Sequence, residues 1–297
     1  MWLIYALCSS AFYGVAETLD NFFVNKEFGH PLTLVFYSSL FNLIYVPILF
    51  FMDRPVLPPV STYPIFFLLG IMSVGYLYPY YKGLQEDDTS VAISFLAIER
   101  IMVPVLAFFV VGEILEPIQY FGIGIIVLSV VMLGLHHSRK KFRMSKGVWY
   151  ISCAALFLAG EAILLKLLFD QGVTVSTAVG GEALVSFILG VSIIGFTNVR
   201  KGIVRALPVF IKMSPIFLVE EFFTFIGLVA ESNAISRASV SIVKGVTMAS
   251  PFFLVIYAWL GYKIFPKVFK EDLHRKKIIR KLVLFALLVI GIMLVKE

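Results

Sequence analysis

The chain has 297 residues, of which 60% are hydrophobic and only 15% are charged. Soluble domains carry roughly 25% charged and about 45–50% apolar residues, so this composition excludes a water-soluble fold. The net charge of +6 comes from residues in loops between apolar segments and not from a folded basic face, which excludes a nucleic-acid-binding surface.

Ten apolar segments follow one another, each close to the ~20 residues that cross about 30 Å of hydrocarbon. They are continuously apolar and do not alternate with polar residues, which favours α-helices over the strands of a barrel. The sequence therefore predicts an all-α membrane protein. The expected helices are 3–22, 31–51, 63–82, 89–111, 116–135, 148–168, 174–196, 215–232, 238–261 and 279–296.

Lysine and arginine residues are distributed unequally among the loops. The loops after the first, third, fifth, seventh and ninth helices, counted with the helix ends that border them, hold nineteen, including Arg200, Lys201 and Arg205, and the opposite side with both termini holds three. By the positive-inside rule the basic loops are cytoplasmic and both termini lie outside. The stretch 139–147 is then a basic cytoplasmic linker between a first unit, 1–138, and a second unit, 148–297.

The two units share a sequence pattern. Glu17 in the first expected helix aligns with Glu161 in the sixth. Because five helices per unit is an odd number, the second unit crosses the membrane in the opposite sense, as in inverted five-helix repeats. The other repeated residues, at a constant offset of 149, are Ser90-Val91-x-Ile93, Gly112 and Pro117 against Ser239-Val240-x-Ile242, Gly261 and Pro266.

The segment 88–122 resembles the ten-helix EamA-like branch of the drug/metabolite transporter superfamily. The matching features are a small-residue helix start, the stretch that ends at Glu99, the pair Gly112-Glu113, and then Pro117 and Gly122. The resemblance extends over both halves and implies a transporter of a small organic metabolite, with no enzymatic activity. The chain departs from the family at Arg100, where Pro is frequent, at Tyr262, where Glu is expected after Gly261, and in its outside termini.

Ionisable side chains near the bilayer centre are the candidate functional groups, because each costs about 2.5–3.5 kcal/mol on insertion scales. Tyr13, Glu17 and Asn21 share one face of the first helix at i, i+4 spacing, with Asp20 beside them. In small multidrug resistance proteins, which the half-unit resembles, an acidic residue of the first helix binds protons and cationic drugs. We therefore expect Glu17 and Glu161 to exchange protons with solute. The alternative is that each carboxyl group only hydrogen-bonds a neighbouring helix.

Other buried charges have weaker support from the sequence. Glu99 and Arg100 are neighbours, but they point about 100° apart on a helix and need not pair, so a structural role and a solute contact both stay open. Lys244 is a candidate for binding an anionic group. Tyr78 and Tyr81, at i, i+3, are candidates for stacking on a cation, although interfacial aromatic belts produce the same pattern.

Carboxylates outnumber basic groups in the expected helices, which favours a cationic or zwitterionic solute. We therefore predict a proton-coupled secondary transporter that works by alternating access in a prokaryotic inner membrane, with a small-molecule solute and the lipid bilayer as its partners. One alternative is a flippase for a lipid-linked head group. The other is an intramembrane Mg²⁺-dependent transferase that uses the run from Glu86 to Asp88. No Walker A loop or zinc-ligand spacing occurs, so no cofactor or metal is expected.

Overall fold

The computed structural model describes residues 1–26, 30–54, 56–86, 89–137, 146–253, 256–257 and 275–296. These residues form helices joined by turns, without a strand among them, which confirms the all-α prediction for this part of the chain. The elements are α1 (Trp2–Lys26), α2 (Pro31–Met52), η1 (Val60–Thr62), α3 (Tyr63–Gly75), α4 (Leu77–Glu86), α5 (Thr89–Val110), α6 (Pro117–His137), α7 (Lys146–Asp170), α8 (Val175–Ser192), η2 (Ile193–Gly195), α9 (Thr197–Ile235), α10 (Val240–Thr247) and α12 (Arg275–Lys296).

Five helical segments are long and apolar enough to cross a membrane, within the part of the chain that the structure describes. Large apolar side chains cover the outer surface, and Phe109 of α5, for example, is 77% exposed. Such a surface suits lipid and not water. The five segments are Pro31–Leu49, Val60–Glu86, Lys146–Asp170, Val175–Gly195 and Thr197–Ile235.

Local sequence signals determine several helix ends. Pro31 occupies the first turn of α2, and the His30 imidazole accepts a hydrogen bond from the Leu32 N–H at 3.2 Å. Just after the C-terminal end of α7, Gly172 has a φ of +79°, a left-handed conformation that favours glycine and ends the helix. Both positions lie at the limits of predicted helices, the start of 31–51 and the gap between 148–168 and 174–196.

Three expected helices differ from the structure, and one of them, 238–261, is interrupted by a turn at 248–249 after α10 ends at Thr247. The expected helix 63–82 is divided at Tyr76 into α3 and α4. The expected helix 215–232 begins much earlier, at Thr197, and ends at Ile235. Arg200, Lys201 and Arg205 therefore lie in α9, and their assignment to a loop was wrong. Pro215 does not start the helix but lies inside it, although proline lacks the N–H of one intrahelical hydrogen bond. Met213 and Phe217, on either side of it, are buried, and their packing stabilises the helix at this point.

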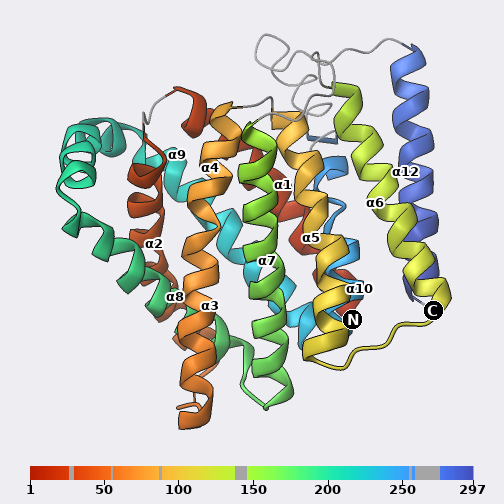
Figure 1. Cartoon of the computed structure of the whole chain (residues 1–297), viewed down its shortest axis with the longest axis horizontal. Coiled ribbons are helices and arrows are strands. Elements are labelled where there is room, and N and C mark those ends of the chain that lie inside the picture. The colour runs from red at the N-terminus through yellow and green to blue at the C-terminus, as the bar shows by residue number, and fades with distance from the viewer. Residues whose placement is uncertain are drawn as a thin grey trace.

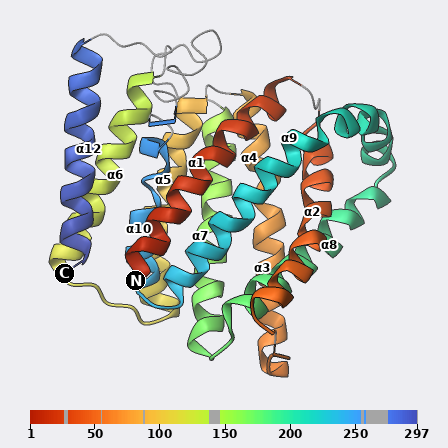
Figure 2. The same ribbon diagram turned by 180° about the vertical axis from the view of Figure 1, so that it is seen from behind.

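The helices pack in adjacent pairs. Helix α1 lies along α9, α6 lies along α12, and α5 packs against α7, as Figures 1 and 2 show from opposite sides. Helices α2 and α3 pack against α8 at the other edge of the molecule. Both chain ends and the connection between α5 and α6 lie at the same end of the bundle (Figure 1).

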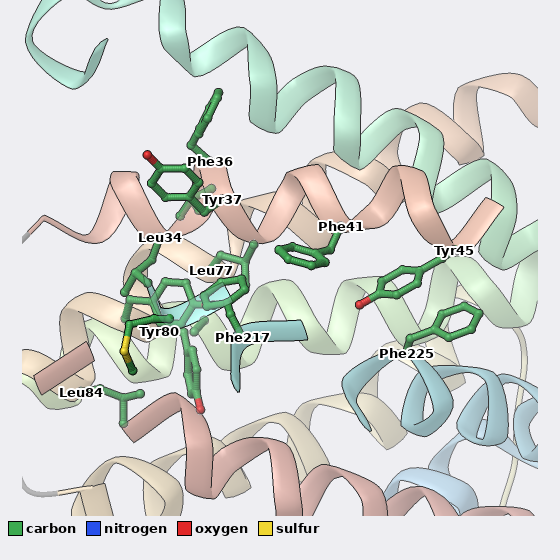
Figure 3. Close-up of a cluster of buried hydrophobic side chains, with 14 of the residues drawn as sticks. Leu34, Phe36, Tyr37, Phe41, Tyr45, Leu77, Tyr80, Leu84, Phe217 and Phe225 are labelled. Atoms are coloured by element: carbon green, nitrogen blue, oxygen red, sulfur yellow. The ribbon is translucent and has the colours of Figure 1, made fainter. Parts of the chain in front are cut away.

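The largest buried cluster joins α2 to α4 and α9 through aromatic side chains (Figure 3). The rings of Tyr45 and Phe225 stack with centroids 4.2 Å apart, and those of Tyr37 and Phe210 stack at 4.0 Å. The Tyr45 hydroxyl also donates to the backbone carbonyl of Glu221 at 2.6 Å. This packing fixes α9 against the first unit and thereby positions the end of α9 that carries the candidate site.

Candidate functional site

Four charged side chains alternate in sign at the centre of the bundle. The Lys244 Nζ of α10 lies 3.1 Å from Oε1 of Glu99 and 2.9 Å from Oε1 of Glu231. The other oxygen of Glu99 contacts the Arg100 guanidinium. We refer to Arg100, Glu99, Lys244 and Glu231 as the ion chain. Its two positive and two negative charges balance, which lowers the cost of holding each one away from water.

Hydroxyl groups complete the partners of Glu231. The Tyr13 hydroxyl of α1 donates to Oε2 of Glu231 at 3.2 Å, and the Thr247 hydroxyl donates to Oε1 at 3.1 Å. Helices α1, α5, α9 and α10 therefore all contribute to one polar site. Since these helices come from both halves of the chain, the site lies between the two predicted units.

The short helix α10 positions Lys244. All eight of its residues are buried, and the Ser239 hydroxyl at its N-cap accepts a hydrogen bond from the Ile242 N–H at 3.2 Å. Lys244 lies in the last turn, where the helix dipole favours a cation. On the partner helices, Glu99 of α5 and Glu231 of α9 are 1% and 2% exposed.

Glu17 lies one turn from Tyr13 on the same face of α1. Both of its carboxylate oxygens accept from the Ser250 hydroxyl, at 3.0 and 3.3 Å. Gly14 permits the close approach of these segments, because a side-chain carbon there would lie 3.1 Å from the Ser250 carbonyl oxygen. The side chains of Asp20 and Asn21 are outside the described residues.

A second acidic pair lies beside the ion chain. Glu161 of α7 and Glu182 of α8 are buried, and the Glu161 carboxylate interacts electrostatically with Glu182, Lys244 and Glu231. Glu182 also hydrogen-bonds the Ser73 hydroxyl of α3. Within the described part of the chain, Oε2 of each carboxylate has no hydrogen-bond partner.

The two candidate tyrosines have different environments. Tyr78 is 37% exposed, whereas Tyr81 is buried in the aromatic cluster, with its ring centroid 5.5 Å from that of Tyr80. They therefore do not present one common face. Lys166 is also peripheral: it forms an ion pair of 3.0 Å with Asp170, whose side chain is 44% exposed at the end of α7.

Arg100 connects the ion chain to an apolar groove between α5 and α6. The groove has a volume of about 470 Å³ and is lined by Arg100 and by apolar residues that include Pro104, Phe108 and Ile123. A larger apolar cavity of about 560 Å³ lies elsewhere, between α2, α3 and α8. Neither has another charged residue in its lining.

Sequence reasoning proposed Glu99, Arg100 and Lys244 but missed Glu231, the residue with most partners in the site. The sequence did contain one indication that Glu231 lies near Lys244. Glu231 and Lys244 lie equally far from the centre of the turn 236–239, so two antiparallel helices joined there bring them together. Within the described residues no group of three or more His, Cys, Asp or Glu side chains is arranged to hold a metal ion.

The first part of this chain is similar to a family of known proteins. Residues 1–135 match the EamA-like transporter family. This family is part of the drug/metabolite transporter superfamily, so the predicted resemblance is confirmed over the segment that contains Tyr13, Glu17, Glu99 and Arg100. Together with the apolar helices, the EamA-like match supports an integral membrane protein, and the segment 1–135 is similar to a family of small-molecule transporters.

The fold also occurs in solved structures. A crystal structure with 14% sequence identity superposes with a TM-score of 0.66, covering 99% of this chain and 94% of the other. The similarity thus extends beyond the EamA-like segment to the second half, but at this identity it concerns the fold alone. No curated protein matches the sequence.

Proposed function

We propose that this EamA-like protein is a secondary active transporter that moves a small cationic or zwitterionic metabolite by alternating access. The observation that carries the proposal is the ion chain, in which Lys244 joins Glu99 and Glu231 from different helices. Buried charges are costly in a membrane protein and are characteristic of solute and ion pathways. The proposed architecture is ten spans in two inverted repeats, with the site where the repeats meet.

A zwitterion suits the alternation of charges in the ion chain. An ammonium group has the same charge and hydrogen-bonding capacity as the Lys244 amine, so it can compete for Glu231 and Glu99. A carboxylate can compete in turn for Lys244 or Arg100. A solute that exchanges partners in this way enters without leaving an unpaired charge in the membrane. A purely cationic solute would instead use the acidic excess that Glu17, Glu161 and Glu182 provide.

We further propose that Glu17 and Glu161 exchange protons during the cycle. Glu17 has a single hydroxyl partner in the described structure, Ser250, and Oε2 of Glu161 has none. Neither carboxylate forms an ion pair within the described residues, so each can change charge without breaking the ion chain. A carboxyl group away from water favours its neutral form and releases its proton when exposed to a less acidic compartment.

Uptake into proteoliposomes tests this function. Purified protein is reconstituted into vesicles with a pH gradient across the membrane, either acidic inside or acidic outside. The vesicles are then offered a panel of radiolabelled amino acids, polyamines and organic cations. We expect saturable, gradient-driven uptake of at least one compound. Lys244→Gln should abolish uptake, because it leaves Glu99 and Glu231 without their common partner. Lys166→Gln is the matched control, since it removes a lysine from a partly exposed pair and should leave uptake unchanged.

The same vesicles separate the rival functions. Transfer of a fluorescent lipid head group between leaflets, without uptake of any soluble compound, would support a flippase and contradict the proposal. Formation of a new lipid product that requires added Mg²⁺ would support a transferase. Glu86, part of the carboxylate run that such an enzyme would use, forms an ion pair with Lys82 at 2.9 Å. Asp87 and Asp88 are outside the described residues.

A further inference from the structure

The connection between α5 and α6 contacts the start of the neighbouring helix α10. The Glu113 carboxylate accepts three hydrogen bonds there: Oε1 from the Ser239 hydroxyl at 2.7 Å and from the Ser241 N–H at 3.2 Å, and Oε2 from the Val240 N–H at 3.0 Å. One side chain therefore satisfies two backbone donors at the first turn of α10. We call these contacts the Glu113 cap.

Both the charge and the local backbone favour the Glu113 cap. A carboxylate at a helix N-terminus gains from the helix dipole as well as from charge-assisted hydrogen bonds. Gly112, directly before Glu113, has a φ of +72°, which lets the chain turn sharply at the end of α5. The Glu113 N–H then bonds to the Ala107 carbonyl at 3.1 Å, which fixes the turn to α5.

The Glu113 cap joins the two helices that carry one ion pair of the site. Glu99 lies in the middle of α5, the helix that precedes the connection, and Lys244 lies on α10, one turn after the capped residues. Their charged groups are 3.1 Å apart. If the start of α10 separates from α5, this pair must lengthen. Glu113 thus acts on the site through the position of α10, without itself touching the ion chain.

The Glu113 cap belongs to one end of the molecule. It lies at the end where both chain termini are found (Figure 1). The sequence repeat aligns Gly112-Glu113 with Gly261-Tyr262, so the second unit has no carboxylate at the equivalent position. A carboxylate cap of this kind is therefore encoded in only one of the two repeats.

We propose that Glu113 is a positioning residue that closes the end of the transporter near the termini, and that the Glu113 cap must open for solute to pass at that end. This inference rests on the alternating access of the proposed function. It gives the two ends different closures: the end near the termini is held by a carboxylate on helix N–H groups, and the opposite end must be held by other contacts.

The test measures water access behind the Glu113 cap. A cysteine replaces Val243, a fully buried residue of α10, in a background with Cys8→Ser and Cys153→Ser. The protein is held in nanodiscs, which expose both faces to a charged, water-soluble thiol reagent. We expect Glu113→Ala to increase the labelling rate at this cysteine about tenfold, as the loss of a helix cap implies. Glu113→Gln should give an intermediate labelling rate. The amide oxygen of the glutamine can accept hydrogen bonds from α10, but its amide nitrogen cannot replace the second accepting oxygen of Glu113.

Two controls separate this effect from general loosening. Glu116→Ala removes an exposed charge from the same connection and should leave the labelling rate unchanged. A cysteine that replaces Ala154, fully buried in α7, should be labelled as slowly in the Glu113→Ala protein as in the protein that keeps Glu113. Equal labelling of the Val243 cysteine in the Glu113→Ala and Glu116→Ala proteins would overturn the proposal, as would equal acceleration at both cysteines.

Folding and transport are followed separately. If Glu113→Ala does not give a folded protein, Glu113→Gln decides the question, and an unchanged rate in that variant overturns the proposal. The labelling assay needs no solute, so failure of the parent protein to transport any compound would contradict the proposed function alone. Normal transport together with an unchanged labelling rate would contradict the closing role of Glu113 alone.

Discussion

Lys244 of α10 and Glu231 of α9 face each other across the turn that joins their helices, with Nζ 2.9 Å from Oε1. Lys244 has a second carboxylate partner, Glu99, whereas Glu231 has only Lys244 as an ion-pair partner among the described residues. The two residues are thus unequal: removing the lysine affects two carboxylates, but removing the Glu231 charge leaves the lysine paired.

This inequality predicts an order of stability. Lys244→Met should lower the free energy of unfolding by about 3–5 kcal/mol, the usual result of breaking a buried ion pair on one side. Glu231→Gln should have a smaller effect, and the double variant should be more stable than Lys244→Met alone. Thermal unfolding in one detergent measures all three, with Lys166→Met as a control expected to change stability by less than about 1 kcal/mol. A double variant that loses more free energy of unfolding than the two single variants together would contradict the coupling between Lys244 and Glu231.

Proton coupling predicts a specific loss in glutamine variants. In Glu17→Gln the amide oxygen can still accept from Ser250, so packing is retained while titration is lost. We expect Glu17→Gln and Glu161→Gln, singly or combined, to lose uptake driven by a pH gradient but to keep exchange of labelled for unlabelled solute. Glu220→Gln, which changes another buried carboxylate of α9, is the control. If both glutamine variants keep the parent's rate and pH dependence at equal protein abundance, the two glutamates are structural.

The predicted orientation can be tested with two cysteines on opposite sides. In cells that express protein without Cys8 and Cys153, a cysteine at Ile114 in the α5–α6 connection, where the native side chain is 78% exposed, should react with an impermeant thiol reagent added outside. A cysteine at Ser138, beside the basic linker, should be shielded until the cells are permeabilised. The opposite result at both positions would invert the topology, and with it the side on which the Glu113 cap lies.

Close packing of α2 against α8 predicts a site where even a methyl group is not tolerated. A Cβ atom at Gly190 would overlap the side chain of Ser39. We expect Gly190→Ala to destabilise the protein by about 1–3 kcal/mol, as other overpacked sites do. Gly124→Ala is the matched control, because a Cβ there has no neighbour within 4 Å. It should be neutral or stabilising, since Ala favours a helix more than Gly. Equal melting temperatures for the two variants would contradict the packing in this region.

Much of the fold follows from the sequence, because the long apolar runs specify helices by length and composition alone. The limits of α9 did not follow, since Pro215 and the basic residues before it usually indicate a loop. The predicted end at 232 placed Glu231 at a helix terminus, where a charge needs no special explanation. The structure continues the helix to Ile235 and buries the side chain.

The candidate site was predictable as a set of residues but not as a set of contacts. Glu99 and Lys244 are unusual charges within apolar runs, and this alone identifies them. Their pairing depends on how α5 and α10 approach each other, and no local pattern encodes that distance. The Glu113 cap joins residues more than a hundred positions apart. The Gly112-Glu113 pair could be recognised from the family, yet its partner helix could not.

The length of α9 constrains how the molecule sits in its bilayer. Its 39 residues would extend for about 58 Å as a straight helix, almost twice the ~30 Å of hydrocarbon that one span requires, and they include Pro208 and Pro215. The exposed Arg200, Lys201, Arg205 and Lys212 all precede Pro215, so we expect the first turns of α9 to lie in the head-group region and only the later turns to cross the lipid. In that position these four cations would anchor the helix at the membrane surface. The depth of Glu231 would then be set by the distance along α9 from the lipid phosphates, and a thinner or thicker membrane would move the ion chain relative to its centre.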